Sequence, residues 1–338
     1  MTVWKRMRYR LEWLGLMAAL KLVPLLPRRV CFELAGMAGA LAAKFDARGR
    51  RVALANLECA FGAGFSPERR LQIVRESYQH FARTMLDLFW SPRLTAQNFR
   101  RYIDVEGFDR FQTEHGSGGC IFVGLHYSNF EWLSLACGWL DAASWIATED
   151  LKNPLVGEFF EKLRGQSGQR TVPREGALVR LYKVLRKGGR ASLLVDTTLP
   201  PHQPTVVVRC FGMQTIVTVA HAWLQERTGL PLVPLHTEAL PGGRYRIVAS
   251  PQVQLRPGAT HQEIAQACWD VFEPVVRLDP APWLWMYKYW RYKPSAAAGY
   301  PFYAHESPAF DQIASRPNYA KLDRSALRTA KPAAVSPP

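Results

Sequence analysis

The chain has 338 residues, of which 48% are hydrophobic and 12% are aromatic. This length and composition provide enough apolar material for a sizeable core, so disorder of the whole protein is excluded. The formal net charge of +15 comes from 43 Lys and Arg residues against 28 Asp and Glu residues. A charge of this size predicts an anionic partner, which could be a membrane face, nucleic acid or an acidic protein.

The first 51 residues carry much of this charge, because they contain eleven basic and three acidic residues. Their basic residues surround an apolar stretch at 11–27, which is short for a full span and is interrupted by Glu12 and Lys21. We expect residues 1–45 to form one or two amphipathic helices that associate with a membrane. A single-pass anchor is one alternative, and an ordinary helical hairpin packed on the core is another. A cleaved signal is disfavoured because the helical apolar pattern continues through residues 30–45.

The remaining chain changes from helical patterns to an α/β rhythm. Helices are expected at 50–61 and from Pro67, where Ser66 supplies an N-cap. Short apolar runs at 120–125, 144–147 and 191–195 predict buried strands, and 232–238 with 245–250 predicts a hairpin. Helical patterns lie at 176–187, 217–227 and 261–277. We therefore predict a central mixed, mostly parallel sheet flanked by helices in a domain spanning residues 46–294, followed by a poorly ordered tail at 295–338.

The six cysteines are scattered, with no C-x-x-C pair and no histidine at a metal-binding spacing. This pattern indicates free thiols in a reducing compartment. The sequence also contains no P-loop, zinc spacing or dinucleotide fingerprint, so neither a metal nor a cofactor is expected.

The strongest local signal for chemistry lies at residues 124–131. His126 directly follows a predicted buried strand, and Glu131 lies in the first turn of the following helix, for which Asn129 is the expected N-cap. An imidazole can take a proton near neutral pH, and a carboxylate on its other nitrogen fixes the tautomer and stabilises the imidazolium. The free N–H groups at the N-terminus of this helix could also bind an oxyanion or a phosphate, so Asn129 is included among the substrate-binding candidates.

Several segments in a shared order resemble the bacterial lipid A biosynthesis (lauroyl/myristoyl) acyltransferases, within the wider glycerolipid acyltransferase superfamily that has an H-x4-D/E motif. The segments that carry the likeness are 50–57, 124–131, 152–155, 163–165, 185–189, 193–196, 211–212, 232–234 and 283–291. The likeness covers about residues 5–294. It implies a glycerolipid acyltransferase-like fold with membrane-associated N-terminal helices. Thr197 stands where the family usually has Gln, which leaves the identity of the acceptor open.

The resemblance implies roles for four of these residues. His126 would be the general base that deprotonates an acceptor hydroxyl as it attacks an acyl thioester, and Glu131 would orient it as the second member of a His–Glu dyad. Arg164 would bind a phosphate of the acceptor, since a guanidinium suits phosphate geometry. Asp196, at the end of a predicted strand, would hold Arg164 or the acceptor. Each could instead have a structural role: His126 and Glu131 in a capped turn, Arg164 at a basic surface, and Asp196 as the cap of the next turn.

The predicted function is transfer of a fatty acyl group from an acyl carrier protein or acyl-CoA to a hydroxyl of a membrane lipid, with a lipid A precursor favoured. A lysophospholipid or another amino- or glycolipid is the alternative acceptor. The expected location is the cytoplasmic face of a bacterial inner membrane, where anionic lipid and an acidic carrier protein would meet the basic chain. A non-catalytic protein that binds membranes or polyanions is the competing hypothesis. The aromatic and basic segment at 283–293 could stack on nucleic acid, but a core-closing role is favoured and no nucleic-acid partner is expected.

Overall fold

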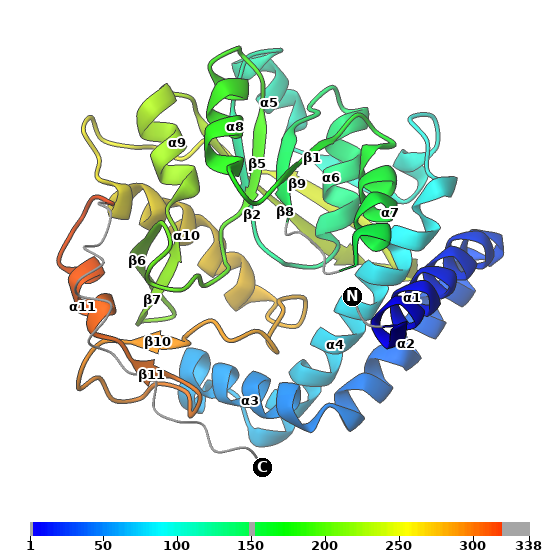
Figure 1. Ribbon diagram of the computed structural model, residues 1–338, viewed down its shortest axis with the longest axis horizontal. Coiled ribbons are helices and arrows are strands. Elements are labelled where there is room, and N and C mark those ends of the chain that lie inside the picture. The colour runs from blue at the N-terminus through cyan, green and yellow to red at the C-terminus, as the bar shows by residue number, and fades with distance from the viewer. Residues whose placement is uncertain (1–2, 149–152, 320–338) are drawn as a thin grey trace.

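The computed structural model describes residues 3–148 and 153–319 (Figure 1). Its centre is a seven-stranded sheet in the order β1-β9-β8-β2-β5-β3-β4, in which only the β8–β9 pairing is antiparallel. The strands are β1 (Ile103–Glu106), β2 (Ile121–Gly124), β3 (Trp145–Thr148), β4 (Arg170–Pro173), β5 (Ala191–Leu194), β8 (Leu232–Leu240) and β9 (Arg244–Ala249). The predicted mixed, mostly parallel sheet is therefore confirmed, and the expected hairpin is the β8–β9 pair.

Both faces of the sheet are covered by helices. On one face α5 (Phe108–His115) and α6 (Phe130–Trp139) share a core with Phe122 of β2, whereas Ile121 and Val123 of the same strand belong to the core on the other face. That second face is covered by α8 (Ala177–Leu185), α9 (Ala220–Thr228) and α10 (His261–Leu278). Burial on both faces explains why β2 is a continuous apolar run rather than an alternating one.

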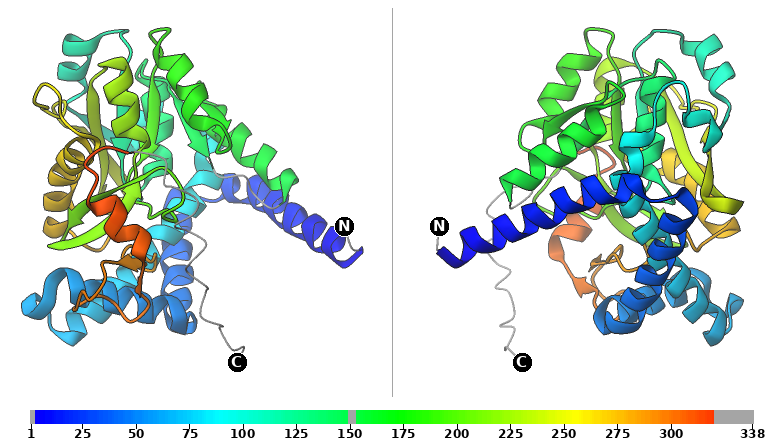
Figure 2. Two further views of the ribbon diagram at one scale, coloured as in Figure 1. Left: turned by 60° about the vertical axis from the view of Figure 1, so that its left-hand side comes forward. Right: turned by 90° about the vertical axis from the view of Figure 1, so that its right-hand side faces the viewer.

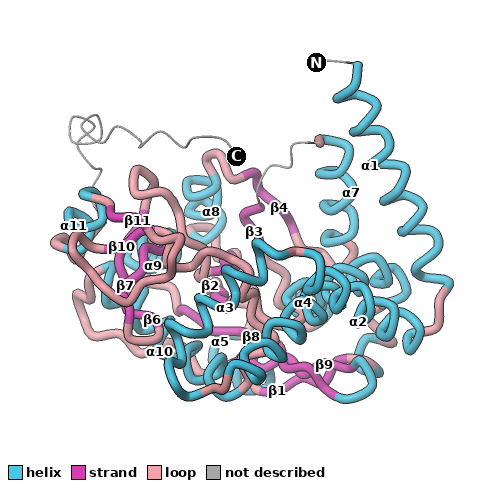
Figure 3. The backbone as a smooth tube through the Cα atoms, turned by 90° about the horizontal axis from the view of Figure 1, so that it is seen from below, coloured by secondary structure: helices cyan, strands magenta, loops and turns pink. Residues whose placement is uncertain are grey.

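Four helices precede the sheet: α1 (Val3–Leu22), α2 (Arg28–Phe45), α3 (Ala47–Phe61) and α4 (Pro67–Trp90). The Ser66 hydroxyl accepts a hydrogen bond from the Arg69 backbone N–H, so the predicted N-cap of α4 is confirmed. Helix α2 runs beside α4, and α1 projects from the body next to α7 (Pro154–Gly165) (Figures 2 and 3). Within residues 3–148 and 153–319, no helix is long and apolar enough to cross a membrane.

Short 3-10 turns join several of these elements. They are η1 (Val23–Leu25), η2 (Gly62–Gly64), η3 (Ser91–Arg93), η4 (Phe99–Arg101) and η5 (Pro241–Gly243). The helix predicted at 217–227 begins only at Ala220, because β6 (Thr205–Cys210) and β7 (Met213–Thr218) form a separate antiparallel hairpin just before it. The apolar residues at the end of β7 run directly into those at the start of α9, and a short apolar run does not by itself distinguish a strand from a helix.

The predicted tail is only partly a tail. Strand β11 (His305–Glu306) pairs with β10 (Tyr292–Lys293), and α11 (Pro308–Ala314) packs its Phe310 against the β6–β7 hairpin. The expectation of poor order is therefore wrong for residues 295–319, where a few apolar anchors dock a Pro- and Ala-rich segment. The rest of the predicted tail, residues 320–338, lies outside the described residues.

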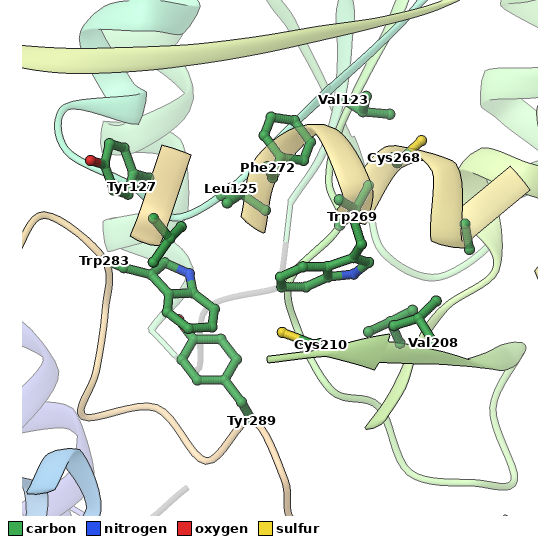
Figure 4. Packing of buried hydrophobic residues seen from close by; sticks show 14 of the residues in the cluster. Val123, Leu125, Tyr127, Val208, Cys210, Cys268, Trp269, Phe272, Trp283 and Tyr289 are labelled. Atoms are coloured by element: carbon green, nitrogen blue, oxygen red, sulfur yellow. The ribbon is translucent and has the colours of Figure 1, made fainter. Parts of the chain in front are cut away.

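The aromatic segment at 283–293 closes the core beside the sheet. Trp283, Trp285 and Trp290 are fully buried, and Trp283 stacks on Tyr289 with ring centroids 3.9 Å apart. Figure 4 shows Trp283 and Tyr289 close to Trp269 and Phe272 of α10. Buried indole faces are not available for stacking on bases, so the core-closing interpretation of this segment is confirmed.

Candidate active site

The carboxyl ends of two neighbouring strands bring His126 and Asp196 together. Strands β2 and β5 pair in parallel with Gly124 opposite Leu194, and the Val195 N–H donates to the Gly124 carbonyl at 2.9 Å. Each strand is followed within two residues by its polar side chain. Side chains beyond the carboxyl ends of adjacent parallel strands meet at one edge of the sheet, which is where open α/β sheets place their ligands.

Asp196 is the carboxylate that holds the imidazole. Its Oδ1 lies 2.8 Å from His126 Nδ1, and its Oδ2 accepts from the His126 backbone N–H at 3.0 Å. The Trp283 indole N–H donates to the same Oδ2 at 3.0 Å. Asp196 is buried while the His126 side chain is 26% exposed, so the pair joins a fixed interior carboxylate to an accessible ring.

This pairing changes the proton affinity of both groups. Burial alone would raise the pKa of Asp196, but the charge of His126 and the hydrogen bonds from its ring and from Trp283 lower that pKa below its ordinary value. Burial alone would lower the pKa of His126, whereas the charge and hydrogen bond of Asp196 and the charge of Glu131 raise it overall. The ring is thereby made a better proton acceptor, which suits a general base.

Glu131 binds Arg164 rather than His126. From the last turn of α7, Arg164 Nε donates to one carboxylate oxygen at 3.0 Å and its Nη2 donates to the other at 2.6 Å. Glu131 lies in the first turn of α6 and is almost completely buried. Burial alone would lower the pKa of Arg164, but the hydrogen bonds and charge of Glu131 raise it. This two-bond geometry is a strong and directional form of ion pair.

The partners of the two carboxylates therefore differ from the sequence prediction. The sequence predicted that Glu131 would hold His126 and that Asp196 would hold Arg164 or the acceptor, whereas Asp196 bonds to His126 and Glu131 bonds to Arg164. The physical reason is topological. The parallel β2–β5 pairing sets Asp196 beside the turn that carries His126, whereas the first turn of α6 presents Glu131 to α7. Glu131 still acts on His126 through its charge.

Asn129 has its expected capping role. Its side-chain oxygen accepts from the Trp132 N–H at 2.9 Å, and its amide nitrogen donates to Asp87 of α4 at 2.8 Å. The residue is fully buried, so both ends of its amide are used to hold the start of α6. Contact between Asn129 and a substrate stays a prediction.

A buried network from α4 that the sequence analysis missed supports this turn. Asp87 accepts hydrogen bonds from Arg28 of α2 (2.9 Å), Tyr245 of β9 (2.7 Å) and Asn129. The available signal was a single acidic residue inside the apolar run at 85–90, since an unpaired buried carboxylate is too costly to be tolerated. The network joins three separate elements to the turn after β2.

Other contacts fix the backbone of the same turn. Ser128 has a positive φ of 50°, an uncommon conformation for a residue with a side chain. Its carbonyl accepts from the Thr84 hydroxyl at 2.8 Å, and its N–H donates to the Pro282 carbonyl at 3.0 Å. The turn is thus held by α4 on one side and by Pro282, directly before the aromatic segment, on the other, which orients His126.

The arrangement supplies an oriented base beside a paired cation. Among the hydrogen bonds of residues 3–148 and 153–319, none involves His126 Nε2, so this nitrogen can accept a proton from a bound hydroxyl. The same residues contain no group of three side chains suited to hold a metal ion. Proton abstraction next to an arginine is the chemistry that this geometry offers.

Comparison with known proteins identifies the family of this chain. The chain is 26% identical over 293 residues to a lipid A biosynthesis lauroyltransferase of Escherichia coli (strain K12), covering 85% of this chain and 93% of that protein. Residues 2–292 match the family described as bacterial lipid A biosynthesis acyltransferase. This match spans the N-terminal helices, the sheet and the aromatic segment. The chain therefore belongs to the bacterial lipid A biosynthesis acyltransferase family.

Proposed function

We propose that the protein transfers a fatty acyl group from an acyl carrier protein or acyl-CoA thioester to a hydroxyl of a lipid A precursor, with His126 as the general base. The observation that carries the proposal is the His126–Asp196 pair, with Nδ1 held and Nε2 free among the described contacts. Membership of the family supports acyl transfer as the reaction class. The donor and the acceptor hydroxyl are part of the proposal.

In the proposed reaction, His126 Nε2 takes the proton of the acceptor hydroxyl as its oxygen attacks the thioester carbonyl. The new C–O bond forms, the C–S bond breaks, and the proton on the imidazolium passes to the departing thiolate. Asp196 holds the tautomer and stabilises the imidazolium. The thioester is already activated, so positioning and proton transfer suffice and no acyl-enzyme is needed.

Glu131 and Arg164 have a second role in this proposal. Arg164 remains 26% exposed on its side chain although Glu131 binds two of its nitrogens. Its remaining N–H groups could bind a phosphate of the acceptor or the oxyanion that forms on the thioester carbonyl. Glu131 would fix the direction of the guanidinium and, through its negative charge, favour the protonated form of His126. In this sense His126 and Glu131 act together without a direct hydrogen bond.

The proposed location is the cytoplasmic face of a bacterial inner membrane. Helix α1 supports membrane association, since its large apolar side chains recur along one exposed stripe. These side chains are Trp4, Met7, Leu11 and Leu14, followed by Leu22 and by Leu25 in η1. Basic residues flank the stripe, as in helices that lie in the interface of an anionic bilayer.

The test is transfer by the purified protein from an acyl carrier thioester to a lipid A precursor, followed by mass spectrometry of the lipid. His126→Ala should lower turnover by about 10²- to 10⁴-fold. His305→Ala is the matched control, because His305 is exposed on β11, and it should leave turnover unchanged. A loss of less than tenfold in His126→Ala would reject the mechanism. Transfer to a lysophospholipid instead would show that the acceptor is not a lipid A precursor. The absence of transfer to any lipid would favour the hypothesis of a non-catalytic protein.

A further inference from the structure

Helix α2 is packed with its small residues inward and its large apolar residues outward. The residues buried against the protein are Cys31, Ala35, Gly36, Gly39 and Ala43. The exposed stripe is Val30, Leu34, Met37, Leu41 and Phe45, and the exposed fractions of the last two are 55% and 76%. A helix that faces only water and a protein core shows the opposite pattern. The outer face of α2 therefore suits an apolar phase outside the protein.

Close packing on α4 holds α2 in this orientation. A Cβ atom at Gly39 would lie 2.5 Å from the Cα of Gln79, which is closer than real Cβ atoms approach. The Gln79 side-chain amide also donates to the Gly36 carbonyl at 3.0 Å. The helix cannot turn its large side chains inward, because the space against α4 admits only small residues. The close contact between α2 and α4 therefore keeps the apolar stripe of α2 exposed.

At the C-terminal end of this stripe, residues of α2, α3 and α4 line an open groove of about 400 Å³. Its lining residues are Ala40, Leu41, Ala43, Lys44, Arg50, Leu71, Val74 and Arg75. Five of these eight are apolar, and the other three are basic. Leu41 and Leu71, which lies on α4 and is 50% exposed, give the groove an apolar surface that continues the stripe of α2. No acidic residue lines it.

Two of the three basic residues that line the groove have no acidic partner. Within the described residues, neither Lys44 nor Arg75 has an acidic partner at salt-bridge distance. Arg50 donates to the carbonyls of Ala43 and Lys44 at 2.8 and 2.7 Å, so its positive charge is fixed at the end of α2. The neighbouring Asp46 accepts from the Gly49 N–H and the Tyr78 hydroxyl, and its negative charge acts on Arg50. Lys44 and Arg75 are therefore the cations of the groove that a ligand can pair with. A ligand with an apolar part and one negative charge complements this surface.

We propose that the groove binds one anionic phospholipid of the membrane, with an acyl chain against Leu41 and Leu71 and the phosphate against Lys44 and Arg75. This inference rests on the membrane location in the proposed function and deepens it by naming a lipid site. The groove is distinct from the reaction site. Arg28, at the other end of α2, bonds to the Asp87 network, and about 24 Å of helix separate it from Lys44 at 1.5 Å per residue. The bound lipid orients the enzyme on the bilayer and is not acylated.

Vesicle binding by the full chain tests the electrostatic half of the proposal. The probes are vesicles of phosphatidylglycerol and phosphatidylcholine, with pure phosphatidylcholine for comparison. Lys44→Gln with Arg75→Gln should weaken binding to the anionic vesicles roughly 25-fold, at roughly fivefold for each cation near an anionic surface. The matched control is Arg180→Gln with Lys183→Gln, which removes two exposed cations from α8 at the far end of the molecule (Figure 1). An equal loss in both double variants would overturn the proposal.

A soluble short-chain lipid tests the groove itself. Dihexanoyl phosphatidylglycerol, kept below its aggregation concentration, should bind the wild type one-to-one in native mass spectrometry. Binding should fall in Lys44→Gln with Arg75→Gln and also in Leu41→Ser with Leu71→Ser. Equal binding of dihexanoyl phosphatidylcholine, or no one-to-one complex, would overturn the proposal. If these variants lost binding to apo acyl carrier protein but kept their vesicle binding, the proposal would also be overturned, because that result identifies a protein-docking surface.

Turnover separates this inference from the proposed function. With a detergent-dispersed acceptor, the Lys44 and Arg75 variants should retain wild-type turnover, because neither residue belongs to the reaction site. A wild type that binds anionic vesicles through the groove but transfers no acyl group would reject the proposed function and leave the lipid site standing. An active wild type whose lipid binding does not depend on the groove would reject the lipid site and leave the proposed function standing.

Discussion

The edge of the sheet around His126 and the outer face of α2 use side chains in opposite ways. Around His126, polar groups are buried and paired, as in the contacts of Asp196 with the imidazole and of Asp87 with Asn129. On α2, large apolar groups such as Met37 and Phe45 are exposed. In the first region the protein replaces water with its own hydrogen bonds, and in the second it leaves a stripe of apolar surface exposed.

The two regions also differ in how far protein contacts cover them. The turn after β2 is held by Thr84 of α4 and by the Pro282 carbonyl, so protein contacts orient His126. The exposed stripe and groove of α2 have no such cover within the described residues. Helix α2 connects the regions, because Arg28 at its start contacts Asp87 and Lys44 near its end lines the groove. Changes at the two regions should therefore have different effects.

The largest expected effect comes from removing the charge of Asp196. Asp196→Asn should lower kcat/KM by about 10²- to 10⁴-fold, because the ring loses its orienting and stabilising partner. Against the opposing effect of burial, Asp196 raises the pKa of His126 above its ordinary value of 6.5. A base works when neutral, so wild-type kcat/KM should rise with pH through that raised pKa, and the rising limb should move to lower pH in the variant. An unmoved limb, or an equal effect in the exposed control Asp109→Asn, would contradict this role.

The next effect concerns stability. Arg28→Met leaves the fully buried Asp87 without its cation, and breaking such a pair should lower the free energy of unfolding by about 3–5 kcal/mol. Urea denaturation measures the change. Arg29→Met is the matched control, since Arg29 is exposed and should change stability by less than about 0.5 kcal/mol. Adding Asp87→Asn to Arg28→Met should recover part of the loss, and a double variant no more stable than Arg28→Met would argue against an uncompensated charge as the cause.

Glu131 and Arg164 should behave as one unit. Because each side chain fixes the other through two hydrogen bonds, the losses of kcat/KM in Glu131→Gln and Arg164→Gln should not add. The double-mutant cycle should give a coupling of about 1–3 kcal/mol. Steady-state kinetics of the four proteins measure it. Additive losses would mean that Glu131 supports His126 independently of Arg164.

The smallest expected effects compare two glycines of the N-terminal helices. Gly39→Ala places a methyl group in the α2–α4 contact and should destabilise by about 1–3 kcal/mol. Gly15→Ala on α1 meets no atom within 4 Å and should be neutral or stabilise by about 0.5–1 kcal/mol, because alanine loses less backbone entropy in a helix. Thermal unfolding measures both. Equal behaviour of the two variants would show that the close approach does not hold α2 in place.

Most of the fold could be predicted from local patterns. The runs at 120–125 and 191–195 are apolar without alternation, which is what strands buried on both faces require, and both are strands at the centre of the sheet. The prediction failed where packing with distant segments decides the structure. Residues 217 and 218 were expected at the start of a helix, yet they end β7, which pairs with β6. Residues 295–319 are ordered by contacts that include that hairpin. Neither contact leaves a local signal.

The candidate site shows the same division. His126 at the end of a strand and Asn129 as an N-cap followed from spacing and residue type, whereas Arg164 was a candidate through the family resemblance. Which carboxylate pairs with which of these side chains could not be predicted in this way. A spacing of five residues favoured Glu131 as the partner of His126, but Asp196 lies 70 positions away and meets the ring at 2.8 Å. Asp87 and Trp283 were missed for the same reason, because their importance lies in what they contact across the fold.

The sequence by itself determined the kind of sheet, the strand that ends at His126, the excess of positive charge and the residue types available for proton transfer. Periodicity, capping and composition act over a few residues, and so they can be recognised without a fold. Only the tertiary structure decided which carboxylate holds the imidazole and which receives the arginine, and that α2 turns its large side chains outward. Those outcomes depend on strand order and on the fit of Gly39 against α4, which involve residues far apart in the chain.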